Sequence, residues 1–501
     1  MIDTVQCRRE GTTNRIDRRA FFTIAAGAPA VFAAARPRVN VLFVIADEWR
    51  AQATGYNGDP NVRTPALDRL ASESVNFENA VSGHPVCCPY RASLMSGQYP
   101  LTHGVFLNDE EFKPKGKTLG ESFADAGYHT GYIGKWHLYG SPEGKYERRL
   151  AYVPPDHRFG FQYWKACECT HDYNRSLYYE DENPTPKYWP GYDAFAQTDD
   201  ACRFIGQRSR ARDPFFLVLS LGPPHFPLNT APERYREIYQ ERDIQLRLNV
   251  PAKLREQAVV DLRGYSAHIA AVDDCIARLL STLEAAGISE RTIVVFTSDH
   301  GDMMRSQGLT TKHVPWDESI RVPFLLRYPQ KLGNKGRRIR TVLNTPDIMP
   351  TLLMLAGLAP PDGVQGTDYS KVCEGASPPR DSAAFLQFPV SYGQARSEGI
   401  GEYRGLRSEQ YTYVRSLHGP WLLYDNHADP YQMHNLCGQA EHRAVQTRLD
   451  RALDARLKQM ADDFLPGREY VARFGYEHNR EINGKPGHFV SPWGDWESTL
   501  S

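Results

Sequence analysis

Four apolar runs along the chain are typical of buried parallel strands, and each run ends in polar side chains. The runs cover residues 39–46, 130–133, 215–221 and 292–297. In open α/β sheets, ligands bind beyond the carboxyl ends of the strands, so side chains from distant parts of a chain meet there. The pattern therefore predicts one crevice that collects the following residues: Asp47 and Glu48, Lys135 and His137, His225, and Asp299 and His300.

Helical patterns separate these predicted strands. Thr64 with Pro65, and Thr345 with Pro346, have the capping chemistry that opens helices. Apolar residues within 264–286 recur at helical spacing. Strands that alternate with helices up to about residue 360 predict an α/β fold with a doubly wound central sheet and helices on both faces.

The chain changes character after Pro360. Residues 361–382 are rich in Pro, Gly, Asp and Ser, and strand-like pieces at 411–416 and 421–424 precede a helical run near 440–463. These features predict a small α+β C-terminal subdomain. We expect three parts: an export signal at 1–35, a main domain at 36–382 and the C-terminal subdomain at 383–501.

The N-terminal segment has the features of a targeting signal. Arg18 and Arg19 precede an apolar stretch that closes with Ala33-Ala34-Ala35, which suits a signal peptidase, and the paired arginines resemble a twin-arginine signal. We expect an exported protein, periplasmic or extracellular; the alternative is an amphipathic N-terminal helix. No other apolar run reaches the roughly eighteen residues of a membrane span, so none is expected in the mature chain.

Composition narrows the class of protein further. The 501 residues are 41% hydrophobic and 24% charged, which excludes a disordered or collagen-like chain. With 59 Lys and Arg against 60 Asp and Glu, the formal net charge is −1, and no nucleic-acid partner is expected. Nine cysteines show no zinc-like spacing, and export would permit disulfides, whose pairing stays open.

The sharpest local signal is Cys87-Cys88-Pro89-Tyr90-Arg91, which resembles the sulfatase signature C-x-P-x-R. The surroundings extend the resemblance over nearly the whole mature chain, in the order and approximate spacing of that family. The resemblance implies a formylglycine-dependent sulfatase of the alkaline-phosphatase-like superfamily, with its catalytic domain at 36–382. The residues that carry it, besides the signature, are Asp47, Gly134-Lys135-Trp136-His137, Pro224-His225, Asp299-His300-Gly301 and Lys312.

The resemblance implies that a formylglycine-generating enzyme converts Cys87 to an aldehyde. The hydrated aldehyde would supply the nucleophile for a sulfate monoester, and its second hydroxyl would let the sulfated intermediate release sulfate. The family also implies a hard divalent cation, and oxygen ligands favour Ca²⁺, with Mg²⁺ as the alternative. Its implied ligands are Asp47, Glu48, Asp299, His300 and the oxygen derived from Cys87.

By the same resemblance, the remaining polar residues have roles in charge compensation and proton transfer. Arg91 would steady the diol and the metal ligands, and Lys135 with Lys312 would neutralise the sulfate oxygens. His137 would take the diol proton, and His225, alone or together with Lys312, would protonate the leaving oxygen.

Three residues depart from the family's pattern. Glu48 stands where a second Asp is common, so it would bind the ion directly, bind it through water, or be displaced from it. His300 stands where Asn is frequent. Tyr90 replaces the Ser that helps the modifying enzyme read its substrate, which makes conversion of Cys87 the step to test.

An aromatic-rich stretch at 152–195 interrupts the periodic pattern. Aromatic faces stack on sugar rings, so we interpret this insertion as a saccharide-binding wall with His171 as a candidate contact. The alternative is that the rings pack a loop that lacks another core.

We therefore hypothesise an enzyme that removes sulfate from a sulfated poly- or oligosaccharide. The first alternative is a phosphate or phosphonate monoester hydrolase of the same superfamily, against which Lys135 and His137 argue. The second is a catalytically silent protein that binds sulfated glycans, which Glu48 and Tyr90 leave open.

Overall fold

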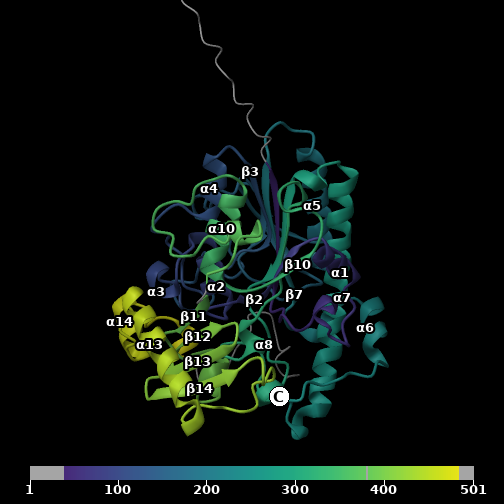
Figure 1. Ribbon diagram of the computed structural model, residues 1–501. Helices are drawn as coiled ribbons and strands as arrows, with labels where there is room; N and C mark the ends of the chain where they lie inside the picture. Colours follow the sequence, from purple (N-terminus) through teal and green to yellow (C-terminus); the bar gives the residue numbers. More distant parts are fainter. Residues whose placement is uncertain (1–38, 380–381, 484–501) are drawn as a thin grey trace, which may run out of the picture. The chain divides into compact units, whose positions relative to one another are not determined.

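Four parallel strands form the centre of a ten-stranded mixed sheet in the computed structural model, which describes residues 39–379 and 382–483 (Figure 1). They are the four predicted apolar runs; the run at 130–133 extends to His129–Lys135, so Lys135 ends its strand. The strands follow one another across the sheet as β10 (Arg337–Asn344), β2 (Val75–Val81), β9 (Phe324–Arg327), β8 (Thr292–Ser298), β1 (Asn40–Asp47), β7 (Phe215–Pro224), β3 (His129–Lys135), β4 (Tyr163–Cys167), β5 (Leu177–Glu180) and β6 (Asn183–Tyr188).

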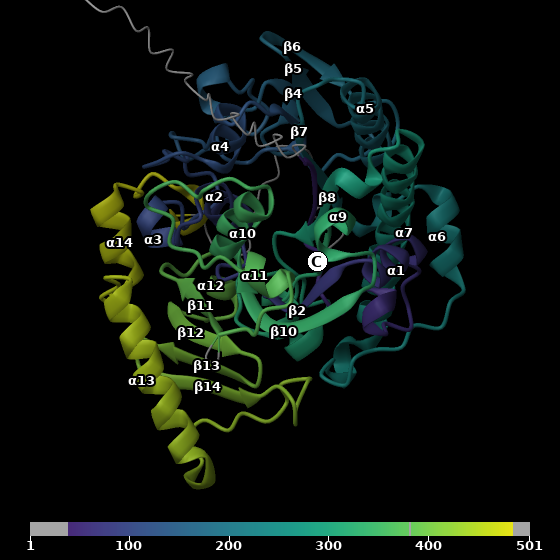
Figure 2. The ribbon, with the colours of Figure 1, turned by 45° about the horizontal axis from the view of Figure 1, so that its top comes forward.

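The alternation of side chains along the central strands explains the two helical layers. Leu42 and Val44 of β1 face one core with α1, α5, α6 and α7, whereas Val41 and Phe43 face another core with α2, α4 and α10. The predicted α/β sheet with helices on both faces is confirmed (Figure 2). These helices are α1 (Pro65–Ser72), α2 (Cys87–Ser96), α4 (Leu119–Asp125), α5 (Asp193–Arg208), α6 (Glu233–Gln240), α7 (Arg255–Ala285) and α10 (Ile348–Leu355).

The stretch at 152–195 is not the irregular insertion that its pattern predicts. It supplies β4, β5 and β6, which extend the sheet at one edge. These strands are short, and β6 contains Pro184 and Pro186, which an edge strand tolerates because one side of its backbone needs no ladder. Most of the rings are buried, including Trp164 and Tyr173, so packing explains them better than a saccharide wall.

One helix begins earlier than the sequence predicts, and another carries Cys87 in its first turn. Helix α7 starts at Arg255 instead of residue 264, and Gly264 lies inside it without interrupting it. The glycine is explained by close packing, because a Cβ at this position would lie 2.3 Å from the Leu228 carbonyl oxygen. Helix α2 starts at Cys87, with Pro89 in its first turn, where a missing N–H costs nothing. Cys87 therefore lies at a helix N-terminus.

The C-terminal part forms a second, antiparallel sheet, as the sequence predicts. It consists of β11 (Ala383–Phe388), β12 (Tyr403–Ser408), β13 (Tyr411–Ser416) and β14 (Gly419–Asp425). Helix α13 (Arg443–Gln459) packs Leu449 and Leu453 on this sheet (Figure 2). Leu386 and Phe388 pack against Val86 and Phe106 of the main domain, and the boundary at 382 stays a prediction. The remaining helices are short: α3 (Pro100–His103), α8 (Asp317–Ile320), α9 (Pro329–Leu332), α11 (Ser370–Cys373), α12 (Gly393–Ser397), α14 (Gly467–Phe474) and α15 (Arg480–Asn483).

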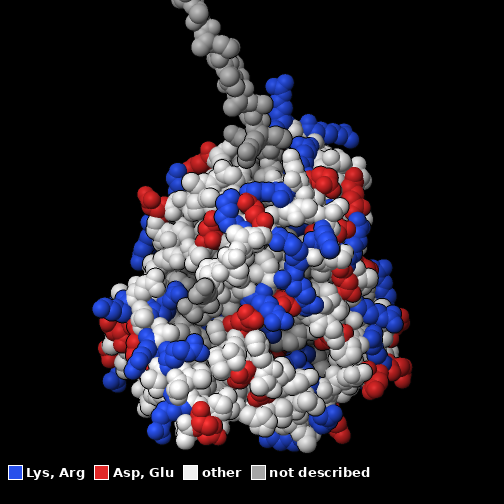
Figure 3. All heavy atoms as spheres, viewed as in Figure 1, with Lys and Arg blue, Asp and Glu red and all other residues white. Residues whose placement is uncertain are grey.

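The predicted export signal at 1–35 lies outside the described residues. Within the described part of the chain, no helix has the length and apolar character needed to cross a membrane. All eight cysteines between residues 39 and 483 are free thiols. On the face shown in Figure 3, basic and acidic side chains are interspersed.

Candidate active site

The carboxyl ends of β1 and β8, with the N-terminus of α2, bring four possible metal ligands together. One donor atom from each of Asp47, Cys87, Asp299 and His300 lies within 4.8 Å of the others, and all four side chains are buried. Cys87 Sγ lies 3.3 Å from His300 Nε2 and 3.7 Å from Asp47 Oδ1. In this structure the thiol occupies the place that a formylglycine oxygen would take.

Hydrogen bonds to the local backbone help to hold these four possible ligands in place. The register of β1 against β7 shifts between Ala46 and Asp47, where the strand leaves the sheet. Asp299 Oδ1 accepts the backbone N–H groups of Glu48 and His300, at 3.1 and 2.9 Å. Glu48 has a left-handed backbone, with φ of 66°, which turns its side chain away from the direction of the strand.

Arg91 connects three of the central strands through both ends of its guanidinium. Nη1 donates to the Lys135 carbonyl oxygen at 2.9 Å and to Ser220 Oγ at 2.8 Å. Nη2 donates to Asp299 Oδ2 at 3.1 Å and to Asp47 Oδ2 at 3.4 Å. The side chain is buried, so these bonds orient both carboxylates toward Cys87 in a site shielded from water.

Two lysines flank the thiol of Cys87. Lys135 Nζ and Lys312 Nζ each lie 3.6 Å from Sγ, and Lys135 also lies 2.6 Å from Asp47 Oδ2. Burial and the Asp47 carboxylate raise the pKa of Cys87, but Lys135, Lys312 and His300 outweigh them, and the net pKa lies well below its ordinary value. The position therefore favours negative charge.

His225 and Lys312 form a hydrogen-bonded pair beside Glu48. His225 Nδ1 lies 2.9 Å from the Phe226 carbonyl oxygen, which only accepts, so Nδ1 carries the proton. Nε2 then accepts from Lys312 Nζ at 2.8 Å. Burial, followed by Lys312 and His171, holds the pKa of His225 well below its ordinary value.

The carboxylate of Glu48 lies at the edge of this group rather than among the four possible ligands. Its Oε2 is 3.1 Å from His225 Nε2 and its Oε1 is 3.7 Å from Lys312 Nζ. Neither oxygen has a hydrogen-bond partner among the described residues, although the side chain is fully buried. Burial raises the pKa of this carboxyl well above its ordinary value.

His137 is paired with an acidic side chain rather than with the thiol of Cys87. Its Nε2 is 3.6 Å from Asp109 Oδ1, and Asp109 is paired with Arg149 at 2.6 Å. Burial lowers the pKa of His137, but the neighbouring Cys169 and Cys88 raise it, and the net shift is upward. Within the described chain, no hydrogen bond joins His137 to Cys87, so its proposed proton transfer stays a prediction.

His171 stacks on His225, with ring centroids 4.2 Å apart and an angle of 19° between the planes. Its Nε2 lies 3.8 Å from Cys169 Sγ. The structure thus places His171 beside the catalytic candidates, while its contact with a substrate stays a prediction. Sequence reasoning missed Cys169 and the Asp109–Arg149 pair, since no local pattern marks them.

Comparison with known proteins agrees with this geometry. The sulfatase family model matches residues 39–358, and the model of the N-sulphoglucosamine sulphohydrolase C-terminal region matches residues 306–459. The chain is 42% identical over 465 residues to the ulvan-active sulfatase of Formosa agariphila, which covers 90% of this chain and 89% of that protein. It is 30% identical over 488 residues to the endo-4-O-sulfatase of Bacteroides thetaiotaomicron, across 87% of this chain and 95% of that protein.

Solved structures give the same result. The sulfatase-family protein YidJ of Bacteroides fragilis aligns with a TM-score of 0.77 and 30% identity, over 87% of this chain and 98% of its own. The predicted fold, the signature at Cys87 and the extent of these matches agree. The chain therefore belongs to the sulfatase family of enzymes.

Proposed function

We propose that this enzyme hydrolyses sulfate monoesters on a carbohydrate, with a nucleophile derived from Cys87 at a Ca²⁺ site. The observation that carries this proposal is the placement of Lys135 Nζ and Lys312 Nζ, each 3.6 Å from Cys87 Sγ. A sulfate ester brings negative charge to the nucleophile. Two buried lysines around that one atom supply the compensating charge, in a site where little water screens them.

The residues present fit a hard divalent cation. Asp47, Asp299 and His300, with the oxygen that would replace the Cys87 thiol, form the proposed ligand set. Glu48 supports the fit because its buried carboxylate lacks a hydrogen-bond partner in the described chain, and a nearby cation would compensate it. When bound, the ion would add positive charge at the sulfate and activate the nucleophile.

Leaving-group protonation is assigned to the pair formed by Lys312 and His225. Lys312 Nζ already donates to His225 Nε2, so a proton is held between these two atoms, and Lys312 Nζ lies 3.6 Å from Cys87 Sγ. The bond from Nδ1 to the Phe226 carbonyl fixes the ring orientation.

Arg91 and helix α2 complete the environment of the nucleophile. Arg91 orients Asp47 and Asp299, and the N-terminus of α2 adds its positive dipole at Cys87. Formylglycine at Cys87 would supply the hydroxyl that attacks sulfur and the second hydroxyl that lets sulfate leave. We assign its formation to a formylglycine-generating enzyme.

The substrate is inferred to be a sulfated polysaccharide or oligosaccharide. The names of two relatives support this class: one is active on ulvan, and the other is an endo-4-O-sulfatase. We also infer that the protein is exported, from Arg18 and Arg19 and the apolar segment that follows them.

The decisive experiment begins with the protein made together with a formylglycine-generating enzyme. Mass spectrometry of the peptide around Cys87 is expected to show the aldehyde or its hydrate. Sulfate release from sulfated polysaccharides is expected to disappear in Cys87→Ala and to persist in Cys202→Ala, a control that removes a partly exposed thiol on α5. Undiminished release by Cys87→Ala would overturn the proposal.

Paired aryl sulfate and aryl phosphonate substrates separate the two enzymatic alternatives. We expect the sulfate to be cleaved faster, because Lys135 and Lys312 flank Cys87. A faster phosphonate rate would favour the phosphonate hydrolase. Tight binding of sulfated glycans by the modified, calcium-loaded protein, without turnover, would favour a silent binding protein.

A further inference from the structure

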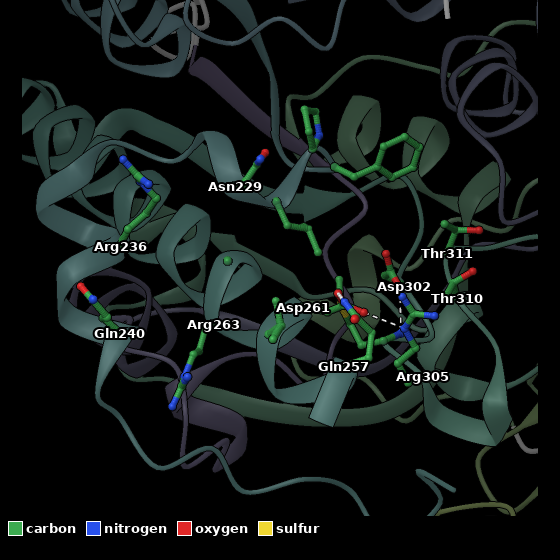
Figure 4. Close-up of a pocket in the computed structure, with 16 residues that line it drawn as sticks. Asn229, Arg236, Gln240, Gln257, Asp261, Arg263, Asp302, Arg305, Thr310 and Thr311 are labelled. Atoms are coloured by element: carbon green, nitrogen blue, oxygen red, sulfur yellow. Dashed lines mark hydrogen bonds and ion pairs between the residues drawn. The ribbon is translucent and has the colours of Figure 1, made fainter. Parts of the chain in front are cut away.

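A cavity of about 640 Å³ adjoins the proposed catalytic centre (Figure 4). Its walls come from the 3₁₀ turn Leu228–Thr230, helices α6 and α7, and the loop at 302–311. Phe226, next to His225, and Thr311, next to Lys312, line it directly. The cavity thus lies on the side of the site where the leaving group is protonated, and its volume is within the roughly 300–1,000 Å³ of ligand pockets.

An ion pair inside this cavity presents an oriented guanidinium. Arg305 Nε donates to Asp261 Oδ2 at 2.6 Å, and Asp261 Oδ1 accepts from Gln257 Nε2 at 2.8 Å (Figure 4). The Arg305 side chain is 18% exposed. Its two terminal nitrogens have no hydrogen-bond partner in the described part of the chain, so the fork that suits a carboxylate or a sulfate is unoccupied.

The loop that carries Arg305 contains several strained backbone positions. Non-glycine residues with left-handed backbones are Met304 (φ 43°), Arg305 (φ 66°), Gln307 (φ 57°), Thr311 (φ 50°) and His313 (φ 78°). Each such residue costs about 1–3 kcal/mol and persists only where the surroundings impose it. The same short loop carries Lys312, so its conformation fixes Arg305 relative to a catalytic lysine.

One hydrogen bond within the loop and two to other segments hold this conformation. The Met304 N–H donates to Asp302 Oδ1 at 2.7 Å, and the Gln307 N–H donates to the Asn249 carbonyl oxygen at 2.8 Å. Thr311 Oγ1 donates to Gln394 Oε1 at 2.8 Å. Arg305 is therefore placed by the fold and not by a freely moving loop.

The remaining lining suits a sugar ring. Leu228, Val260 and Met304 give the cavity an apolar side, and Val260 is 60% exposed. Apolar side chains combined with a few oriented polar groups are the usual composition of a ligand pocket. Two further arginines line the cavity, Arg236 from α6 and Arg263 from α7, and Figure 4 shows both pointing away from the pair of Arg305 and Asp261.

We propose that this cavity binds the sugar unit next to the sulfated one, and that Arg305 recognises an anionic group on that unit. The group is the carboxylate of a uronic acid or a second sulfate ester, both of which match the guanidinium fork. This inference rests on the proposed function, because it takes the sulfated sugar to lie at Cys87. Arg305 is then a specificity-determining residue, held in position by Asp261.

The test compares four compounds. They are a sulfated disaccharide whose neighbouring unit is a uronic acid, the same disaccharide with its carboxyl group reduced, the reduced form with a second sulfate on that unit, and 4-nitrophenyl sulfate, which has no second sugar unit and no second sulfate or carboxylate. Arg305→Gln is expected to lower kcat/KM on at least one of the two anionic disaccharides by roughly 10- to 100-fold. Its rates on the reduced disaccharide and on 4-nitrophenyl sulfate are expected to stay within about twofold of wild type.

Arg234→Gln is the matched control, since it removes an exposed arginine of α6 that does not line the cavity, and it is expected to leave all four rates nearly unchanged. A loss confined to the uronate identifies a carboxylate ligand, and a loss confined to the disulfated compound identifies a sulfate. Equal losses on 4-nitrophenyl sulfate, or no loss on either anionic disaccharide, would overturn the inference.

Binding measured by calorimetry separates this inference from the proposed function. Cys87→Ala protein is titrated with the same disaccharides, with and without Arg305→Gln. If wild type releases no sulfate from any compound, the proposed function fails, and this titration alone decides the inference: weaker anionic binding in the Arg305 variant supports it, and unchanged binding overturns it. Arg305→Lys, which keeps the charge but not the fork, is the second variant in case Arg305→Gln does not fold.

Discussion

Replacing Arg91 by lysine tests whether the geometry of the guanidinium, and not its charge alone, organises the site. Arg91 uses Nη1 for the Lys135 carbonyl and Ser220 Oγ, and Nη2 for Asp299 and Asp47. A lysine has a single nitrogen and reaches one of these two sides. The variant therefore keeps the positive charge and loses about half of the hydrogen bonds.

The expected magnitude follows from those bonds. Two buried hydrogen bonds at about 1–1.5 kcal/mol each give a loss of about 2–3 kcal/mol in the free energy of unfolding. Arg91→Met leaves Asp47 and Asp299 without this partner and is expected to lose about 3–5 kcal/mol. Because Arg91→Lys also breaks the link that ties the two carboxylates to Lys135 and Ser220, kcat/KM for sulfate release is expected to fall by roughly 10- to 100-fold.

Urea unfolding measures the stability change, and initial rates of sulfate release measure the catalytic change. The control is Arg69→Lys, at an exposed pair with Glu284, which is expected to change stability by less than about 0.5 kcal/mol. If Arg91→Lys matches wild type in both measurements, the fork geometry is irrelevant. If Arg91→Met is no less stable than Arg91→Lys, the reasoning about the buried charges fails.

Three further predictions address the metal, the sulfate and the pH range of stability. Treatment with EDTA, which removes calcium, is expected to lower Tm, because the buried carboxylates lose a counter-charge. Glu48→Gln is expected to show a smaller drop in Tm on EDTA treatment, because one of those carboxylates is gone. An equal drop in the variant and in wild type would contradict the proposal that the cation compensates Glu48. Lys135→Met is expected to lower kcat/KM by roughly 100- to 1,000-fold, since the lysine lies 3.6 Å from Cys87 Sγ, and rates within tenfold of wild type would argue against sulfate binding there. Burial lowers the pKa of His268 to about 4, below its unfolded value of about 6.5, so the stability that it contributes above pH 6.5 is lost as the pH falls toward 4. At pH 5 the expected loss in the free energy of unfolding, measured with urea, is about 2 kcal/mol. His268→Gln should make the free energy of unfolding less dependent on pH in this range.

The sequence predicts the catalytic candidates because they follow buried strands. Asp47 and Asp299 end parallel strands that are adjacent in the sheet, so their meeting is a property of the topology. Lys135 and His225 follow the next strands across the sheet in the same way. A buried strand that ends in polar residues can be recognised in a single sequence, because an apolar run and the residues that follow it are local features.

Contacts made by side chains across long sequence separations are not visible in that way. Cys169 lies beside His171, and the Asp109–Arg149 pair lies beside His137, yet nothing local in the sequence marks these residues. The strands β4 to β6 were missed for a different reason. They are four to six residues long, and the prolines of β6 suppress the strand pattern at an edge where the fold tolerates them.

The loop from residue 302 to residue 313 shows why specificity is harder to predict than chemistry. In the proposed mechanism, Lys312 is fixed by the reaction, since it pairs with His225 and adjoins Cys87. Arg305 lies seven residues earlier on the same loop, so the backbone conformation that positions Lys312 also positions the guanidinium in the cavity. We expect a change at position 305 to alter only what the cavity binds, whereas a change in the backbone of this loop would move Lys312 as well. We therefore infer that substrate preference varies through the side chain of residue 305, while the proposed role of Lys312 in catalysis preserves the loop conformation.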